Sequence, residues 1–382
     1  HRGVHASAHG HEDARTLAKD IEKKRKGARV PLLTGMQRGY ERDLLLDDEV
    51  VRRFLSKDRP APDDPPCWLV ATSAGEVGID LSSDRLLSDL DTADHILQRL
   101  GRLNRAGETR GEATVVYREK DLQGEKDPAP SLRATVDYLR TLENASPEAL
   151  LATPPPVEAL TAPPPIPPLR PWHVDAWSLT SIAEPETYVC WREDVEDRAD
   201  DTVSERDREA VMAFYRVRAA ERLKQYAGSL VGELRKRADR FERRALLVES
   251  DGSLRAGTVE QLIDRHESAF AFATLILPPG FGVLDGNGMV DWSPPGRTPV
   301  EMAADPLAHY DRSATDARRR VRAPAGAPPP RTDAEGWRLR AWFRPGSDDE
   351  SQTAEGWAYY RAPPRDKQAT EEVSLDDHLG HV

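Results

Sequence analysis

The sequence predicts an α/β protein whose first part is a parallel sheet flanked by helices. Over residues 12–117, short apolar runs alternate with segments whose apolar residues recur at helical spacing. Such alternation is typical of βαβ units, which build parallel sheets. A proline-rich stretch at about 150–171 then separates this part from a second half that holds seven of the eight tryptophans. The second half is therefore expected to have a core of its own.

The elements of the first part follow one another in a regular order. Leu17 and Ile21 belong to an apolar helical stripe, and the run VPLLTG ends in glycine, as a buried strand often does. Each proline of 61–66 disfavours helix in the residue before it, which predicts a loop there. We expect helices over 12–28, 41–57 and 92–107, short strands over 30–35, 84–90 and 111–117, and a strand that leads into a glycine-bearing loop over 67–81.

The second half is expected to be a mixed α/β region. Residues 150–171 are typical of a stiff polyproline spacer, with a binding motif as the alternative. A long helical stretch is predicted from about Ser204 to Arg244. Strands are predicted over 187–193, 337–343 and 356–362, with a buried strand and a loop over 270–282.

The charge is unevenly distributed along the 382 residues. The net charge of −12 argues against a surface coated for nucleic acid or anionic membrane, although it does not exclude a local basic groove. Residues 1–118 carry 5 Lys and 15 Arg against 20 Asp plus Glu, so this part is neutral. Residues 216–244 carry 10 basic and 4 acidic residues, which predicts either a track for single-stranded DNA or a solvated helix face.

The sequence features that report on location favour the cytoplasm. Two cysteines are too few for a disulfide framework and suit a reducing compartment. The chain contains no apolar run long enough to span a membrane and no signal peptide. Its first residue is not methionine, so we expect a piece of a longer protein. The crowded His1, His5, His9 and His11 are interpreted as a frayed terminus rather than a metal site.

Residues 98–105 (QRLGRLNR) form a motif near the end of a predicted helix. Arg102 and Arg105 are three positions apart and project from one helical face. Two fixed guanidinium groups suit a transferring γ-phosphate, because arginine stays charged and presents planar donors. Gly101 would allow close backbone approach, and Gln98 can hydrogen-bond near the nucleotide or the attacking water. An arginine-rich surface helix is the alternative.

A second motif, ATSAGEVGIDL at 71–81, ends 17 positions before the first begins. Small hydroxyl residues and free N–H groups straight after a strand can hold a nucleic-acid phosphate. Asp80 can orient this loop or take part in the nucleotide cleft. An ordinary glycine-rich turn is the alternative. The turn residues are Thr72, Ser73, Gly75 and Gly78.

Together the two motifs resemble motifs V and VI of superfamily 2 helicases, which lie in the second RecA-like lobe of those enzymes. Residues 32–43 (LLTGMQRGYERD) resemble the stretch upstream, where Arg38 and Arg42 would contact nucleic acid; a solvated helix start explains them equally well. Within the superfamily, ATSAGEVGIDL followed by LGRLNRAGE is most similar to the CRISPR-associated helicase–nuclease of type I systems. The subtype in which the nuclease follows the helicase (I-U, also called I-G) is favoured.

This resemblance implies an ATP-dependent translocase on single-stranded DNA that uses ATP and Mg²⁺ and is recruited by the CRISPR guide-RNA surveillance complex. Arg102 and Arg105 would be arginine fingers. The ATP cleft would include Gln98, Gly101, Gly78 and Asp80, while Thr72, Ser73 and Gly75 would couple contact with DNA phosphates to ATP. No membrane partner is implied.

Two further sequence features bear on the missing parts of such an enzyme. The phosphate loop G-x-x-x-x-G-K-[ST] is absent, and Asp48-Glu49-Val50-Val51 matches the metal-holding D-E-x-H motif only superficially. The first lobe is therefore expected outside this chain. The final LDDHLGHV resembles the opening of an HD-type nuclease domain, in which the histidine matching His378 helps hold a divalent transition metal. A chance Asp-His pair is the alternative.

These observations predict four parts and one leading function, that of the ATP-dependent single-stranded DNA translocase of a type I CRISPR helicase–nuclease. The parts are an incomplete RecA-like lobe (1–118), a connector with the proline-rich linker (119–170), an accessory C-terminal region (171–370) and the start of a nuclease domain (371–382). The alternatives are another superfamily 2 DNA or RNA helicase, in repair or restriction, and a non-catalytic nucleic-acid-binding scaffold derived from a helicase.

Overall fold

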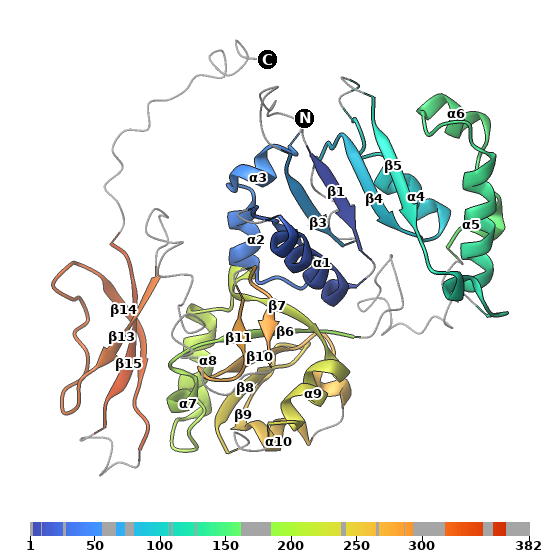
Figure 1. The fold of residues 1–382 in the computed structure, drawn as a ribbon. Coiled ribbons are helices and arrows are strands. Elements are labelled where there is room, and N and C mark those ends of the chain that lie inside the picture. The colour runs from blue at the N-terminus through green and yellow to red at the C-terminus, as the bar shows by residue number, and fades with distance from the viewer. Residues whose placement is uncertain are drawn as a thin grey trace, which may run out of the picture. The chain divides into compact units, whose positions relative to one another are not determined.

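The computed structural model has two compact units (Figure 1). The first is His1–Ala183 with Asp285–Met289, and the second is Glu184–Leu284 with Val290–Val382. None of the helices in the described part of the chain is both long and apolar enough to cross a membrane. The described residues are 3–8, 10–25, 28–55, 66–72, 80–105, 107, 110–126, 128–161, 185–237, 242–264, 267–285, 287–292, 318–346 and 354–363. Ser73, Gly75, Gly78 and His378 lie outside them.

A five-stranded sheet forms the centre of the first unit. Its elements are β1 (Val4–Ser7), α1 (His11–Lys24), β2 (Leu32–Leu33), α2 (Gly39–Leu45), α3 (Glu49–Arg52), β3 (Trp68–Ala71), β4 (Arg85–Asp89), α4 (Ala93–Leu100), β5 (Glu112–Val116), α5 (Ala129–Thr141) and α6 (Pro147–Ala152), with short 3₁₀ helices at Glu119–Leu122 and Val157–Ala159. The strand order is β2-β3-β1-β4-β5, and every neighbouring pair is parallel. The predicted fold class is confirmed.

Helices cover both faces of this sheet, because alternate side chains of each strand point to opposite faces. Ala6 of β1 and Val70 of β3 pack with α1 on one face. On the other face, Leu69 of β3 packs with α2 and α3, and Leu86 of β4 packs with Ile96 of α4. Strands β1 and β3 are therefore buried on both faces, as in other parallel sheets.

Strand β1 lies at the centre of the sheet, between β3 and β4. The prediction that His5 belongs to a frayed terminus is therefore wrong, since this side chain is only 2% exposed. His5 and Ser7 at alternate positions conceal the apolar run that usually identifies a doubly buried strand. His11 begins α1, whereas His1 and His9 lie outside the described residues.

Residues 119–160, assigned from the sequence to a connector, add helical structure to the first unit. Leu132 of α5 packs against Leu90, which directly follows β4. Tyr138 of α5 packs with Ala93 of α4 and with Ala159. Packed structure therefore continues well past residue 118.

A segment from much later in the chain, Asp285–Met289, belongs to the first unit. Met289 is 2% exposed, in the same apolar cluster as the α1 face of the sheet. The backbone N–H of Arg38 donates to the carbonyl of Gly288 at 2.8 Å. Gly288 has a φ of +73°, and a Cβ atom there would lie 2.5 Å from Cβ of Glu41, so only glycine fits.

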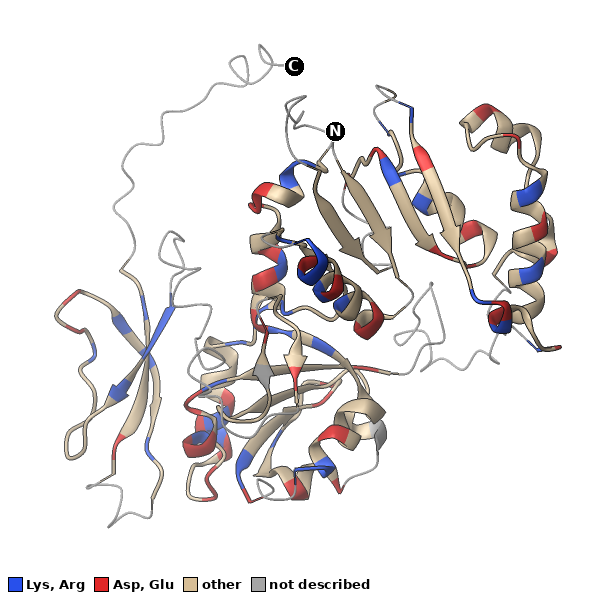
Figure 2. Cartoon of the chain, in the orientation of Figure 1, with Lys and Arg blue, Asp and Glu red and all other residues tan. Residues whose placement is uncertain are grey.

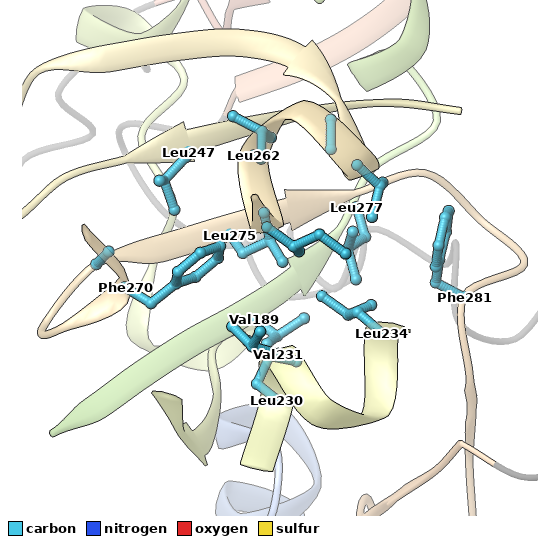
Figure 3. Close-up of a cluster of buried hydrophobic side chains, with 14 of the residues drawn as sticks. Val189, Leu230, Val231, Leu234, Leu247, Leu262, Phe270, Leu275, Leu277 and Phe281 are labelled. Atoms are coloured by element: carbon cyan, nitrogen blue, oxygen red, sulfur yellow. The ribbon is translucent and has the colours of Figure 1, made fainter. Parts of the chain in front are cut away.

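The second unit contains a mixed five-stranded sheet with its own core (Figure 3). Its elements are β6 (Glu186–Trp191), α7 (Val195–Arg198), α8 (Glu205–Phe214), β7 (Leu223–Tyr226), α9 (Ala227–Arg235), β8 (Arg244–Val248), β9 (Leu254–Thr258), α10 (Val259–Ile263), β10 (Thr274–Leu277), β11 (Val283–Leu284), β12 (Val290–Asp291), β13 (Arg318–Ala323), β14 (Arg338–Phe343) and β15 (Gly356–Arg361), with 3₁₀ helices at Ala219–Glu221 and Glu267–Phe270. The order is β7-β6-β10-β8-β9. Val189 and Leu275 pack there with Leu230 of α9 and Leu262 of α10.

The single helix predicted from about Ser204 to Arg244 is wrong. That stretch contains α8, β7, α9 and the first residue of β8. In β7, Leu223 pairs with Val189 of β6 and is fully buried. Pairing with β6 overrides the helical spacing of the flanking residues, because strand formation depends on the neighbouring strand as much as on local preference.

A three-stranded antiparallel sheet with the order β13-β15-β14 forms the last described part of the second unit. Trp357 and Tyr359 of β15 pack with Tyr215, the residue after α8. The fully buried Asp194 accepts a hydrogen bond from the hydroxyl of Tyr359 and pairs with Arg320 of β13. Both apolar packing and a buried ion pair therefore hold this sheet in place.

We expect Met289→Ala to destabilise the first unit by about 2–5 kcal/mol, because truncating a buried side chain leaves a cavity. Amide hydrogen exchange in β1 and β3 should accelerate accordingly. Leu151→Ala, at a position of α6 that is 84% exposed, is the control and should leave exchange unchanged. Equal exchange in the two variants would contradict the assignment of Asp285–Met289 to this core.

Candidate functional site

The described candidate residues lie at two opposite edges of the parallel sheet. Thr72 directly follows β3 and so lies at the carboxyl edge, from which the connection through Arg38 to α2 also leaves. Helix α4 starts after the carboxyl end of β4, and Leu103 beyond it forms a bridge with Ser83, just before β4. Arg102 and its neighbours therefore lie at the amino edge.

Asp80 and Arg105, predicted from two separate motifs, form an ion pair at the amino edge. Nε of Arg105 lies 2.9 Å from Oδ1 of Asp80, and the side chains are 47% and 56% exposed. Water weakens such an exposed pair, so the carboxylate orients the guanidinium without holding it strongly. The guanidinium can therefore exchange this carboxylate for another anion, such as a phosphate.

The backbone around Arg102 is fixed by the segment that precedes β4. The carbonyl of Arg102 accepts from the N–H of Ser83 at 2.9 Å, and the N–H of Asn104 donates to the carbonyl of Ser83 at 2.7 Å. Helix α4 ends at Leu100, and Asn104 has a φ of 45°, the left-handed conformation that turns the chain after the helix. The prediction that Arg102 and Arg105 project from one helical face is therefore wrong. Gly101 has a helical φ of −61°, but a Cβ there would lie 3.2 Å from the carbonyl oxygen of Gln98. Gln98 itself is exposed on α4.

Arg99, which the sequence analysis did not single out, anchors α4 to the sheet. Its side chain is 2% exposed, and Nη2 lies 2.6 Å from Oδ2 of Asp91. Nη1 donates to Oγ of Ser88 and to the carbonyl of Asp89, both at 3.0 Å. By fixing α4, Arg99 also fixes the start of the turn that carries Arg102, three positions later. The sequence signal that could have identified this anchor is an arginine beside the apolar stripe of a predicted helix, with an aspartate eight positions earlier.

His5 is buried close to these cations. Neither ring nitrogen has a hydrogen-bond partner in the described structure. Burial, assisted by the charges of Arg99 and Arg102, lowers the pKa of His5 to about 4. The imidazole is therefore neutral at pH 7.

The predicted nucleic-acid residues differ in accessibility. Thr72 is 7% exposed, and its N–H donates to the carbonyl of Leu33 at 3.0 Å. The side chain of Arg38 is 6% exposed, and its Nε donates to Oε2 of Glu41 at 2.7 Å. Arg42 is exposed and has no ion-pair partner among the described residues. Of these three, Arg42 alone presents its side chain to solvent.

No group of three or more His, Cys, Asp or Glu side chains suited to a metal ion occurs in the described ranges. Asp48 instead caps α3, accepting hydrogen bonds from the N–H groups of Val50 at 2.9 Å and Val51 at 3.2 Å. The acidic stretch at Asp48 is thus a helix start. His378 lies outside the described residues, so its assignment stays a prediction.

Residues 11–108 match the family model described as "CRISPR-associated nuclease/helicase Cas3, C-terminal". The match contains both motifs, so the predicted resemblance to the CRISPR-associated helicase–nuclease is confirmed for this part of the chain. The subtype stays a prediction. No curated protein matches the chain.

Several solved structures are similar to this chain at low sequence identity. T. fusca Cas3 with AMPPNP is similar over 78% of this chain and 37% of its own, at 14% identity and a TM-score of 0.45. T. fusca Cas3 with ADP has the same coverage and TM-score at 15% identity. A chain of a CRISPR RNA-guided surveillance complex, pre-nicking, is similar over 78% of this chain and 39% of its own, at 14% identity and a TM-score of 0.42. This chain thus spans less than two fifths of these proteins.

We expect Arg99→Met to destabilise the first unit by about 3–5 kcal/mol, because Asp91 would stay buried without its cation. Adding Asp91→Leu should restore part of the loss, since two apolar side chains leave no buried charge. Urea unfolding of the single and double variants measures the coupling, with Arg140→Met at a side chain that is 68% exposed as the control. A double variant no more stable than Arg99→Met would contradict the proposed anchor.

The stability of the first unit should also depend on pH through His5. Because its folded-state pKa lies below the unfolded value, the unfolded chain binds more protons between pH 6.5 and about 4. The contribution of neutral His5 to the free energy of unfolding is fully present above pH 6.5. About 3 kcal/mol of that free energy is lost as the pH falls to 4. Urea unfolding of the natural chain and of His5→Leu across this range measures the difference. Parallel pH profiles would show that His5 is not buried in the neutral form.

Proposed function

We propose, from the Cas3 C-terminal match over residues 11–108, that the first unit is the second RecA-like lobe of an ATP-dependent translocase on single-stranded DNA. The observation that supports this most directly is the amino edge of the sheet. There the exposed Asp80–Arg105 pair lies in the same turn region as Arg102. The backbone carbonyl of Arg102 accepts a hydrogen bond from the N–H of Ser83, which fixes this region. Two guanidinium groups on one short segment match what a departing γ-phosphate requires.

In this proposal, Arg102 and Arg105 stabilise the charge that develops on the phosphoryl group during ATP hydrolysis. Asp80 orients Arg105 until the phosphate replaces it as the partner. Gln98, exposed one turn before Arg102, would contact the nucleotide or the attacking water, and Gly101 would allow close approach. ATP and Mg²⁺ would be held by a phosphate loop, which this sequence lacks.

The carboxyl edge would contact the DNA backbone. Arg42 is the exposed cation there, and Thr72 leads into the loop with Ser73 and Gly75. Arg38 would contribute only if it left Glu41. Because Thr72 lies at one edge and Asp80 at the other, the residues between them would couple DNA contact to the nucleotide.

The complete protein is proposed to act in type I CRISPR interference in the cytoplasm, recruited by the guide-RNA surveillance complex. A nuclease domain beginning near His378 and loaded with a divalent transition metal would degrade the translocated strand. A repair or restriction helicase would use the same lobe with other partners, and a non-catalytic scaffold would bind nucleic acid without turnover.

We expect Arg105→Ala, in the complete protein, to reduce DNA-stimulated ATP hydrolysis by about 10³–10⁵-fold while DNA binding stays nearly unchanged. Phosphate release with and without single-stranded DNA measures turnover. Arg110→Ala, an exposed arginine outside the motif, is the matched control and should hydrolyse ATP normally. Normal turnover in Arg105→Ala would refute the arginine-finger role, and no turnover in the natural protein would favour the scaffold.

A further inference from the structure

Strand β5 is an open edge of the parallel sheet. The strand order ends at β5, and β4 is its one neighbouring strand in the described part of the chain. The exposed residues of β5 are Glu112, Ala113, Thr114 and Val116. The opposite edge, β2, has only two residues and follows Pro31, whereas β5 has five residues, a regular register with β4 and neither lysine nor proline. Such protective features usually prevent strand addition, so β5 is available to receive a strand.

The backbone groups that face outward from β5 alternate along the strand. The N–H of Glu112 and the carbonyl of Val116 bond to residues that flank β4, at 3.1 and 2.9 Å. Both residues therefore point their backbone groups toward β4. Because successive residues of a strand point these groups to opposite sides, Ala113 and Val115 present theirs to the open side. The same alternation assigns Tyr117, directly after β5, to the open side.

A second copy of β5 in antiparallel orientation can meet these groups. With Val115 opposite Val115 of the second copy, Ala113 lies opposite Tyr117, so every outward-facing residue meets another. Such pairs exchange both of their hydrogen bonds in an antiparallel ladder. The backbone of Arg118 is also extended, with a φ of −102° and a ψ of 139°, so the pairing can continue to this residue.

The side chains match in the same register. Glu112 lies opposite Arg118 of the second copy at both ends of the pairing, and Figure 2 shows the acidic start and uncharged body of β5. Thr114 lies opposite Val116, which is 43% exposed. Opposite charges and β-branched neighbours stabilise cross-strand pairs. The side chains of Glu112 and Arg118 are 67% and 73% exposed, in local ion pairs of 3.4 and 3.1 Å that water weakens, so these partners can be exchanged.

We infer that β5 pairs with β5 of a second copy of this chain, which joins two parallel sheets into one. The contact uses the same residues on both copies and therefore closes at two chains. Parallel pairing in register would place Glu112 beside Glu112 and Arg118 beside Arg118, so like charges disfavour it. A contact made mainly by one short strand buries little surface, so we expect a dissociation constant in the micromolar range.

The test is analytical ultracentrifugation of the full chain across micromolar concentrations. The natural chain should be in a concentration-dependent equilibrium between monomer and dimer. Glu112→Arg places two arginines opposite each other, and Arg118→Glu places two glutamates there, so each variant alone should associate about tenfold more weakly. An equimolar mixture of the two variants should recover the dimer, because each arginine then faces a glutamate.

Two exposed positions of α8 supply matched controls. Arg206→Glu and Glu209→Arg make the same charge reversals away from β5 and should associate as the natural chain does. Ala113→Pro tests the backbone pairing without a change of charge, because it removes an outward N–H that β4 does not use. Proline is tolerated on an edge strand whose N–H faces solvent, so the fold should persist while association weakens about tenfold.

A natural chain that stays monomeric across this range would overturn the proposal. Natural association by either charge-reversal variant or by Ala113→Pro would also overturn it, because another surface would then join the copies. A mixture that gives no more dimer than either variant alone would contradict the antiparallel register. None of these measurements involves ATP or DNA, so failure of the proposed function leaves them unaffected.

Discussion

The amino edge of the first unit depends on one buried ion pair. Arg99 is nearly inaccessible to water, and a guanidinium in that environment is tolerable only beside a carboxylate, which Asp91 supplies at 2.6 Å. The pair fixes α4 against the end of β4, so the helix cannot slide along the strand. The position of the helix in turn determines where the residues after it lie, including the turn at Asn104 and the guanidinium of Arg105. The exposed groups are thus placed by one that no substrate would touch.

The same edge brings several charged groups close together. Arg102 lies near enough to His5 to lower its pKa, and burial keeps that imidazole neutral beneath it. The pair between Arg105 and Asp80 is half-exposed and therefore weak. Guanidinium groups that are fixed in position and only weakly paired suit an anion whose charge develops during a reaction. They need to rearrange little when that negative charge develops.

The sequence predicted the parallel sheet well, but not the groups that depend on tertiary contact. Alternation of apolar runs identified most of the first unit, yet β1 was missed because His5 interrupts its apolar character. β7 was absorbed into a predicted helix, since only pairing with β6 distinguishes it. Arg99 looks like any helix arginine until Asp91 is seen beside it. The local sequence pattern reflects what each residue prefers, whereas these outcomes depend on which strands and side chains meet in the folded protein.

The segment Asp285–Met289 has a consequence for how the protein is made. The last strand of the sheet ends at Val116, but the apolar cluster beneath α1 also contains Met289. At typical rates of synthesis, roughly 9–35 s separate the two on the ribosome. During that interval the first unit cannot complete its apolar cluster, so part of its core stays exposed to water. Its folding is therefore tied to the arrival of the second unit, and a late fault in translation would leave both unfinished.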